Sequence, residues 1–394
     1  MTKKDLRDAV IVSTARTPVG KFRGALATIS APDLAAFSIK EAVRRSGVAS
    51  ETIDEVIIGN VYNTEWANIS RVSVHQAGLP LCVPAFAINR VCSSSLNALA
   101  VASVMIKTGN YDTVVTGGVE SYSQQPHNIR RPGTAYPETL EVVIVQSTGP
   151  ALGKTTMITT AENLAKKYGL TRKECDEFSV LSHQKAANAW NNGWFDEQVV
   201  PFSVPQRKGP DIVFKVDECV RFDMTYEMAA KLKPVIDPYG IVTAANSSPR
   251  NDASAAVVVM SREKAHSLGI KPLAVVREFA AAGCDPHIMG IGPVYSTRKL
   301  FEKTGYTIKD FDLIELNEAF AAQSIPCIRE LNIDMDKLNV EGGAIAIGHP
   351  NGASGSILTA RMVYALKRRN LERGLISFCC AGGQGFSLII ENED

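Results

Sequence analysis

The stretch FDLIELNEAF, residues 311–320, decides how this chain is expected to fold, because its design occurs twice. An aspartate stands near its start, a short apolar run follows, and a polar turn ends it. The segment IDEVIIGNV, residues 53–61, is built in the same way. Short apolar runs bounded by polar turns are typical of buried strands. We therefore expect two buried strands at corresponding places in two similar halves.

The spacing after these two strands also repeats. Asp54 lies 38 residues before Cys92, and Asp312 lies 37 residues before His349. In each half a turn and a helix rich in small residues follow the strand. We interpret the repetition as a duplication of one α/β unit.

Strand and helix segments alternate around these anchors, which predicts an α/β fold with a largely buried sheet. Strands are predicted within 8–14, 53–61, 111–121, 271–283, 311–320 and 374–390, and helices at 30–47, 93–110, 292–305 and 352–369. The polar middle contains two helices, one with a capping box at Thr171–Glu174. We expect it to be an insertion that lies over the first half. The predicted domains are 1–121 with 244–271, the insertion 122–243, and 272–394.

Composition excludes several classes of function. The 394 residues include 42 basic and 41 acidic side chains, so the net charge is +1 and gives no support for nucleic-acid binding. We see no apolar stretch long enough to span a bilayer and no signal peptide, and we expect a cytoplasmic protein. The eight cysteines include no CxxC pair, so we expect neither a zinc site nor a redox dithiol.

Three polar residues stand at junctions where chemistry is favoured. Cys92 lies between a strand and a helix, where the helix N-terminus favours a thiolate. His349 lies in a glycine-rich loop before a helix, and Asn317 ends a strand, where an amide can donate to an oxyanion. The alternatives are a buried structural cysteine, a turn histidine and a helix-capping asparagine.

The segment ISFCCAGGQGF, residues 376–386, contains two adjacent cysteines before a run of glycines. If LISFCC is a strand, Cys379 and Cys380 point to opposite faces. Only one of them can then face a site shared with Cys92 and His349. The glycines that follow offer free backbone N–H groups for an oxyanion hole.

Nine motifs in this order resemble the thiolase family, the acetyl-CoA acetyltransferases and 3-ketoacyl-CoA thiolases, along nearly the whole chain. They are ARTPVGKFRGAL, DEVIIGNV, VCSSSLNAL, GGVESYSQ, TAENLAKKYGL, DPHIMGIGPV, LNEAFAAQ, GGAIAIGHPNGASG and CCAGGQG. The resemblance implies a five-layered α/β fold and a ping-pong reaction. It implies that Cys92 is the acylated nucleophile, His349 its base and Cys379 the second acid/base, while Asn317 holds a water at an enolate oxygen.

The resemblance also implies the binding sites. One oxyanion hole uses His349 and the water held by Asn317, and the other uses the N–H groups of Cys92 and Ala381. Coenzyme A would be a co-substrate, with no permanent cofactor and no metal, and the chain would form a homodimer or homotetramer. The inserted segment would bind coenzyme A. The implied contacts are Arg221 and Ser248 for coenzyme A, and Met157 and Phe320 for the acyl group.

The chain departs from the family pattern around the site. The usual C-G-S-G is CSSS at 92–95, H-M-G is TMI at 156–158, and G-N-A-S-G is ANSSP at 245–249, followed by Arg250. Ala381 replaces a glycine and is expected to resist a positive φ, and Glu341 replaces an asparagine. We therefore expect a non-standard acyl group from fatty-acid or aromatic-acid degradation. Arg130, Arg131 or Arg250 either holds an acyl carboxylate or is solvated, and an aromatic or branched acyl chain is equally open.

Two other interpretations remain open at this point. A ketoacyl-ACP synthase shares the fold but would place a histidine or asparagine where this chain has Cys379. A catalytically weak binding or scaffold subunit that needs an accessory protein would explain the altered pocket.

Overall fold

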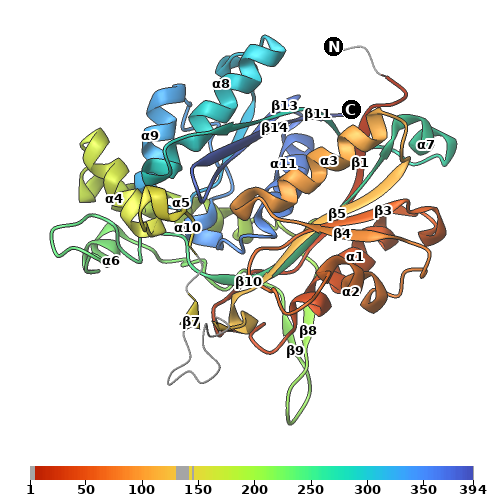
Figure 1. Cartoon of the computed structure of the whole chain (residues 1–394), viewed down its shortest axis with the longest axis horizontal. Coiled ribbons are helices and arrows are strands. Elements are labelled where there is room, and N and C mark those ends of the chain that lie inside the picture. The colour runs from red at the N-terminus through yellow and green to blue at the C-terminus, as the bar shows by residue number, and fades with distance from the viewer. Residues whose placement is uncertain (1–4, 130–141, 144–145, 394) are drawn as a thin grey trace.

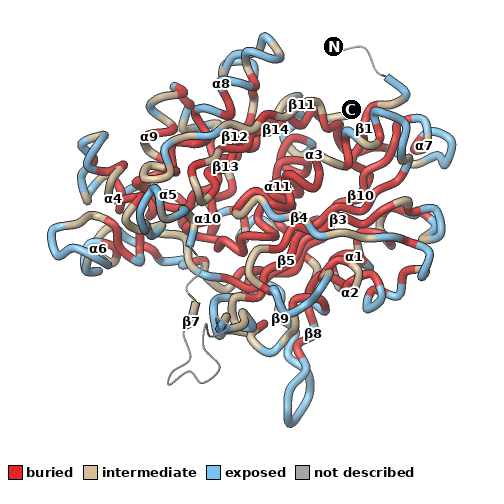
Figure 2. Tube along the Cα trace, in the orientation of Figure 1, coloured by how far each residue is buried: buried red, intermediate tan, exposed pale blue. Residues whose placement is uncertain are grey.

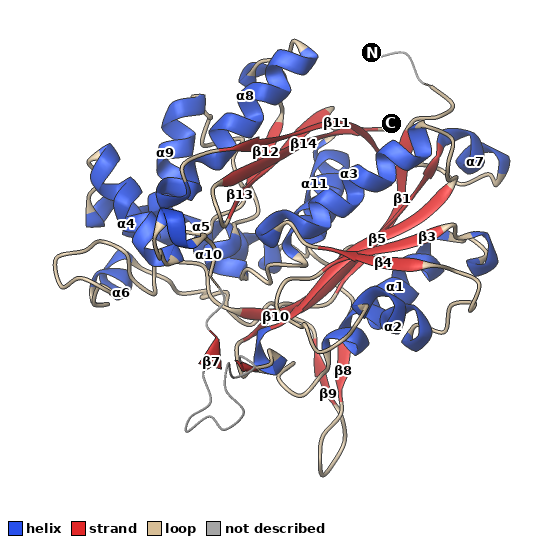
Figure 3. Ribbon diagram, viewed as in Figure 1, coloured by secondary structure: helices blue, strands red, loops and turns tan. Residues whose placement is uncertain are grey.

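The computed structural model describes residues 5–129, 142–143 and 146–393. Within them, ten strands form one mixed sheet in the order β12-β13-β14-β11-β1-β10-β5-β3-β4, with β2 paired to β10. These are β1 (Ala9–Arg16), β2 (Gly20–Lys21), β3 (Glu55–Gly59), β4 (Ala85–Ile88), β5 (Thr113–Ser121), β10 (Asn251–Ser261), β11 (Ala274–Gly283), β12 (Leu313–Leu316), β13 (Arg373–Cys380) and β14 (Gln384–Asn392). Where β1 meets β11, Val10 and Ile11 pair with Val275 and Ala274. Either side of this short junction forms a half-sheet (Figure 3).

The two half-sheets have the same topology. The first runs β1-β10-β5-β3, with two antiparallel pairs followed by a parallel one. The second runs β11-β14-β13-β12 with the same sequence of antiparallel, antiparallel and parallel pairs. Strand β4 extends the first half-sheet parallel to β3. The expected duplication is confirmed.

The two repeated aspartates make equivalent hydrogen bonds. Asp54 Oδ2 accepts from the N–H groups of two consecutive residues at the start of β5, at 2.7 and 2.9 Å. Asp312 Oδ2 accepts from two consecutive N–H groups at the start of β13, both at 2.9 Å. Each aspartate thus ties its own strand to the parallel neighbour, which is why the residue precedes both apolar runs.

Helices cover both half-sheets and separate them, giving five layers (Figure 1). Helices α1 (Ala31–Ser46) and α2 (Ile69–Gln76) pack on the outer face of the first half-sheet. Helices α3 (Ser94–Lys107) and α11 (Ser354–Arg369) lie between the half-sheets. Helices α8 (Gly292–Thr304) and α9 (Ala321–Leu331) cover the outer face of the second. Figure 2 shows buried residues continuing through the central layer.

The central layer explains the small residues of α3 and α11. Their apolar side chains share one core with both half-sheets, and this core includes Leu96, Met362, Val257 and Leu388. Close packing needs small side chains where elements touch. A Cβ added to Gly118 of β5 would collide with the carbonyl of Gly352, just before α11.

The segment between β5 and β10 does not simply lie over the first half, so that expectation is wrong. Its helices α4 (Met157–Tyr168) and α5 (Arg172–Asn191) bury Leu164 and Phe178 in the core of the second half, because their apolar faces meet α9 there. The hairpin β8 (Phe202–Val204)–β9 (Ile212–Phe214) buries Phe202 against the first half. The short elements β6 (Asn128–Ile129), β7 (Val142–Val143), α6 (Tyr226–Ala230), α7 (Arg262–Ser267) and α10 (Ala344–Ile347) complete the chain.

The local signals at helix ends are confirmed. Ser30 caps α1 by accepting from the Asp33 N–H, and Gly47 ends it with a φ of 70°. The capping box at Thr171 and Glu174 begins α5. Across the described ranges, no helix is both long and apolar enough to cross a bilayer.

Candidate active site

Cys92 lies on a strained turn that leads from β4 into α3. The turn is a single 3₁₀ segment, Val91–Ser93, and Val91 has a φ of 48°. A β-branched residue is a genuine outlier in that region, and such strain persists only where the surrounding structure enforces it. The turn presents the Cys92 thiol at the N-terminal end of a helix of 14 residues.

Three N–H donors act on the Cys92 thiol. Asn351 Nδ2 donates to Sγ at 3.3 Å. The backbone N–H groups of Ala381 and of Cys92 itself also act on the thiol and lower its pKa. Burial nevertheless raises the pKa of Cys92 to about 12, with a smaller contribution from the nearby Cys380, while these three donors lower it. The resting group is therefore a thiol that needs a base.

His349 is held by hydrogen bonds on both its backbone and its ring. Gly348 before it has a φ of 117°, and the His349 N–H donates to Asn251 Oδ1 at 2.8 Å. The ring Nδ1 lies 2.7 Å from Ser354 Oγ, which donates its own hydrogen to the Pro350 carbonyl at 3.0 Å. Since the hydroxyl has one hydrogen, Nδ1–H must be the donor in the first bond. This assigns the tautomer that leaves a lone pair on Nε2.

The Nε2 atom of His349 is buried, and no described residue is hydrogen-bonded to it. Burial lowers the pKa of His349 to about 4, so the ring is neutral near pH 7. A thiol and a neutral imidazole with a free lone pair are the two partners of nucleophilic catalysis by cysteine.

Cys92 and His349 open into the same cavity, which has a volume of about 650 Å³. Four other predicted site residues line it, namely Met157, Ser248, Phe320 and Ala381. Ser248 is fixed by two hydrogen bonds of 3.0 Å, from its N–H and its hydroxyl, to the Ala319 carbonyl. The structure therefore brings six of the predicted residues together around one space.

Three predicted residues lie outside the wall of this cavity. Asn317 follows β12 and is 1% exposed, and neither its Oδ1 nor its Nδ2 has a partner among the described residues. Cys379 is completely buried. Arg221 is exposed, with its N–H bonded to His183 Nδ1 at 3.2 Å. Two further arginines named from the sequence, Arg130 and Arg131, fall outside the described residues.

The two adjacent cysteines face opposite sides of β13, as strand geometry predicts. Cys380 belongs to the central core with Cys92, and its thiol donates to Ser93 Oγ at 3.0 Å. Cys379 belongs to the core of the second half, which also contains Phe320. Burial, then the nearby Cys92 and Cys380, raises the pKa of the Cys379 thiol well above its usual value.

Most departures from the family pattern are absorbed by local contacts. Ser93 Oγ donates to the Arg90 carbonyl at 3.2 Å, and Ser95 Oγ accepts from the Ser356 N–H at 3.0 Å. Glu341 forms a buried ion pair with Arg368. These side chains therefore stabilise the loops around the site.

The expectation that Ala381 resists a positive φ is confirmed. Its φ is not positive, and Gly382 and Gly383 adopt the left-handed conformation instead, at 83° and 82°. The alanine therefore keeps its N–H directed at Cys92 without a backbone penalty.

Three residues of the cavity wall were not singled out from the sequence. Asn351 touches the nucleophile, and its Oδ1 accepts from the Tyr122 hydroxyl at 3.0 Å. The Tyr62 ring lies 5.0 Å from that of Tyr122. Tyr62 and Tyr122 follow β3 and β5, and the carboxyl ends of strands are the edge at which α/β sites form. Their position directly after two predicted strands was the feature of the sequence that could have identified both tyrosines as site residues.

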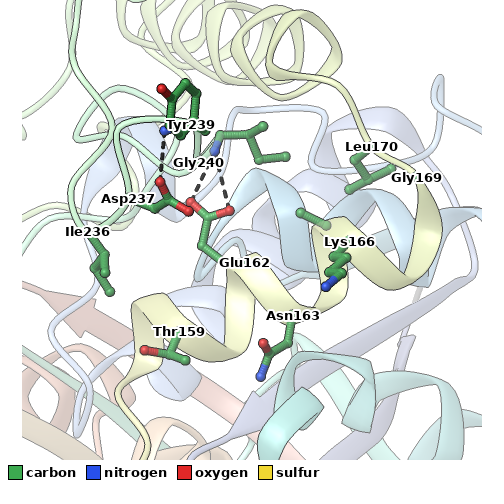
Figure 4. Close-up of a pocket in the computed structure, with 12 residues that line it drawn as sticks. Thr159, Glu162, Asn163, Lys166, Gly169, Leu170, Ile236, Asp237, Tyr239 and Gly240 are labelled. Carbon is green, nitrogen blue, oxygen red and sulfur yellow. Dashed lines mark hydrogen bonds between the residues drawn. The ribbon is translucent and has the colours of Figure 1, made fainter.

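A second cavity, of about 470 Å³, lies between α4 and the loop 236–241 (Figure 4). Glu162 of α4 ties this loop down by accepting from the N–H groups of Ile241 and Val242, the latter at 2.8 Å. No thiol or imidazole lines it. Among the residues that the structure describes, no group of three His, Cys, Asp or Glu side chains gathers as a metal site.

Comparison with known proteins gives consistent matches. The family model for the N-terminal domain of thiolase matches residues 9–263, and that for the C-terminal domain matches residues 270–392. An acetyl-CoA acetyltransferase of Cupriavidus necator is 45% identical, covering 98% of this chain and 100% of that protein. A 3-ketoacyl-CoA thiolase of Bacillus subtilis is 43% identical with the same coverage.

Solved structures agree. The crystal structure of the Bacillus anthracis acetyl-CoA acetyltransferase has a TM-score of 0.93 and 40% identity, over 98% of each chain. Human mitochondrial 3-ketoacyl-CoA thiolase in complex with CoA has a TM-score of 0.92 and 36% identity, over 99% of each chain.

Proposed function

The chain belongs to the thiolase family and is an acyltransferase, and we propose that it cleaves a 3-ketoacyl-CoA with coenzyme A through an acyl group carried on Cys92. The reverse Claisen condensation uses the same steps. The observation that carries the proposal is that the Cys92 thiol, which accepts a hydrogen bond from Asn351, shares one cavity with the free Nε2 of His349.

In the first half-reaction, His349 Nε2 takes the Cys92 proton as the sulfur attacks the keto carbon. The bond between C2 and C3 then breaks, and Cys379 gives its proton to C2 so that acetyl-CoA leaves. In the second, coenzyme A gives its thiol proton to Cys379 and attacks the acyl carbon. The bond to Cys92 breaks, and the sulfur regains its proton from His349. Both residues thus act as acid and base in turn.

Two oxyanions need stabilisation in these steps. The N–H groups of Cys92 and Ala381 serve the oxygen on the acyl carbon, since both act on the sulfur beside it and lower its pKa. His349 and a water held by Asn317 serve the enolate oxygen. The amide of Asn317, buried without a partner in the described part of the chain, supports this role.

Coenzyme A is the co-substrate in this proposal. Ser248 contacts its pantetheine arm in the cavity, and Arg221, exposed outside the cavity wall, contacts the nucleotide. Met157 and Phe320 contact the acyl group. The proposed domains are residues 1–121 with 244–271, the coenzyme-binding insertion 122–243, and residues 272–394.

We further propose a cytoplasmic homo-oligomer, a dimer or a dimer of dimers, that acts in fatty-acid or aromatic-acid degradation. Strand β4 ends the described sheet, with three half-buried residues and one exposed. A sheet edge of this kind is a ready template for pairing with a second chain. Light scattering coupled to size-exclusion chromatography measures the oligomeric state.

The test of the proposed function is peptide mass spectrometry after the protein is mixed with acetyl-CoA and with 3-ketoacyl-CoA esters. We expect an acyl mass on the Cys92 peptide, its loss in Cys92→Ala, and its persistence in Cys82→Ala, since Cys82 is exposed and lies outside the cavity. No acyl mass with any ester would refute the proposal. The predicted alternative of a scaffold subunit is not supported, because the relatives are named as enzymes.

A further inference from the structure

A chain of contacts connects the nucleophile to an arginine. Asn351 Nδ2 lies 3.3 Å from Cys92 Sγ, and Asn351 Oδ1 accepts from Tyr122 at 3.0 Å. The guanidinium carbon of Arg250 lies 5.8 Å from the centre of the Tyr122 ring. All four side chains line the same cavity. Arg250 is therefore linked to the sulfur through two side chains, Tyr122 and Asn351, that line the same cavity.

The charge of the described cavity wall is one-sided. Arg23 and Arg250 line it, and no aspartate or glutamate does. Within the described ranges, the Arg250 guanidinium forms no ion pair with a carboxylate, and its side-chain contact is the face of Tyr122. A guanidinium on a cavity wall is a fork of donors that matches a carboxylate.

Two tyrosines, Tyr62 and Tyr122, also line the cavity, together with Cys92 and Arg250. The two tyrosine rings lie 5.0 Å apart. Met157 and Phe320 add apolar surface to the same cavity. An acyl chain in this cavity therefore meets both apolar carbon and hydrogen-bond donors.

We infer that the acyl substrate is a short chain ending in a carboxylate, held by Arg250 beside Tyr122. The inference rests on the proposed function and specifies the class of substrate as the CoA ester of a 3-keto dicarboxylic acid. Thiolysis leaves the carboxylate on the acyl group bound to Cys92 and releases acetyl-CoA. Arg250 takes no part in the covalent steps and determines specificity.

A competing role for Arg250 is a contact with a phosphate of coenzyme A, and the two roles predict different kinetics. A contact with the acyl carboxylate affects only substrates that carry one. A contact with coenzyme A affects every CoA ester to the same extent.

The test compares 3-ketoadipyl-CoA, which ends in a carboxylate, with its terminal carboxamide. In the intact protein we expect kcat/KM to favour the carboxylate by about tenfold or more, as for a charge-assisted hydrogen bond. We expect Arg250→Gln to lower kcat/KM for the carboxylate by about 10- to 100-fold and to leave the carboxamide unchanged. Arg250→Lys should keep part of the preference. The matched control is Arg207→Gln, an exposed arginine between β8 and β9.

Three results would overturn the inference: equal use of both esters by the intact protein, an equal loss on both esters in Arg250→Gln, or a carboxylate preference that survives in Arg250→Gln. Loading of Cys92 by acetyl-CoA is measured on the same samples. If acetyl-CoA loads Cys92 and no carboxylate preference exists, the inference fails while the proposed function stands. If nothing loads Cys92, the proposed function itself has failed.

Discussion

Replacing Asn351 by leucine removes one donor from the Cys92 sulfur and keeps a side chain of similar size. The amide nitrogen now donates to Sγ at 3.3 Å, and its oxygen is fixed by Tyr122 at 3.0 Å, so the donor is already oriented before any substrate arrives. Because the site is buried, a bond to the charged form has a large effect on the thiolate. We expect Asn351→Leu to raise the pKa of Cys92 further above its value of about 12.

The size of the effect follows from the chemistry of the bond. A hydrogen bond to a charged group contributes about 1.5–3 kcal/mol. At about 1.4 kcal/mol per pKa unit, the pKa of Cys92 rises by about one to two units. At a pH well below that pKa, the thiolate fraction falls by about 10- to 100-fold. Asn351→Asp should lose more, because a carboxylate cannot donate and also repels the thiolate.

The assay is the rate of iodoacetamide alkylation of the Cys92 peptide at fixed pH, resolved by mass spectrometry from the seven other cysteines. Tyr122→Phe is the matched control. It removes only the bond that orients the amide, so we expect a loss of about tenfold at most. An unchanged alkylation rate in Asn351→Leu, or a faster rate in Asn351→Asp than in Asn351→Leu, would refute the electrostatic reasoning.

Three further predictions concern positioning and stability. Ser354→Ala should lower kcat about fivefold with KM nearly unchanged, because a hydrogen bond of about 1 kcal/mol no longer fixes the His349 tautomer; steady-state kinetics measures both constants, and a change in KM alone would contradict this role. Burial raises the pKa of Glu120 to about 8, whereas an unfolded glutamate ionises near pH 4.3, so the folded chain binds more protons between these values and this carboxyl makes stability fall as pH rises to about 8. Glu120→Gln should therefore make the free energy of urea unfolding depend less on pH over that interval. If the variant and the unmodified protein show the same dependence on pH, this role of Glu120 is excluded. Asp217→Asn should destabilise the fold by about 3–5 kcal/mol, because it leaves the Arg16 guanidinium buried without its partner; urea unfolding measures the loss, which the double variant with Arg16→Met should largely restore.

The helix ends that depend only on neighbouring residues were predicted correctly from the sequence. Ser30 and Gly47 bound α1, and Thr171 begins α5, as side-chain capping and left-handed glycine require. Strands β4 and β10 were not predicted. The β10 segment begins with small and polar residues that are buried only because strands pair with it on both sides.

The sequence by itself determined the duplicated α/β unit, the family, and six residues around one cavity, including Cys92 and His349. Those follow from chain order and from motifs whose residues are neighbours along the chain. Only the tertiary structure decided which other side chains share the cavity with the Cys92 sulfur. Asn351, Tyr122 and Arg250 come from three separate segments, and α3 and α11 bring those segments to one cavity by packing between the half-sheets. A periodic pattern encodes which face of an element is buried, but it carries no information about which distant side chain lies across that face.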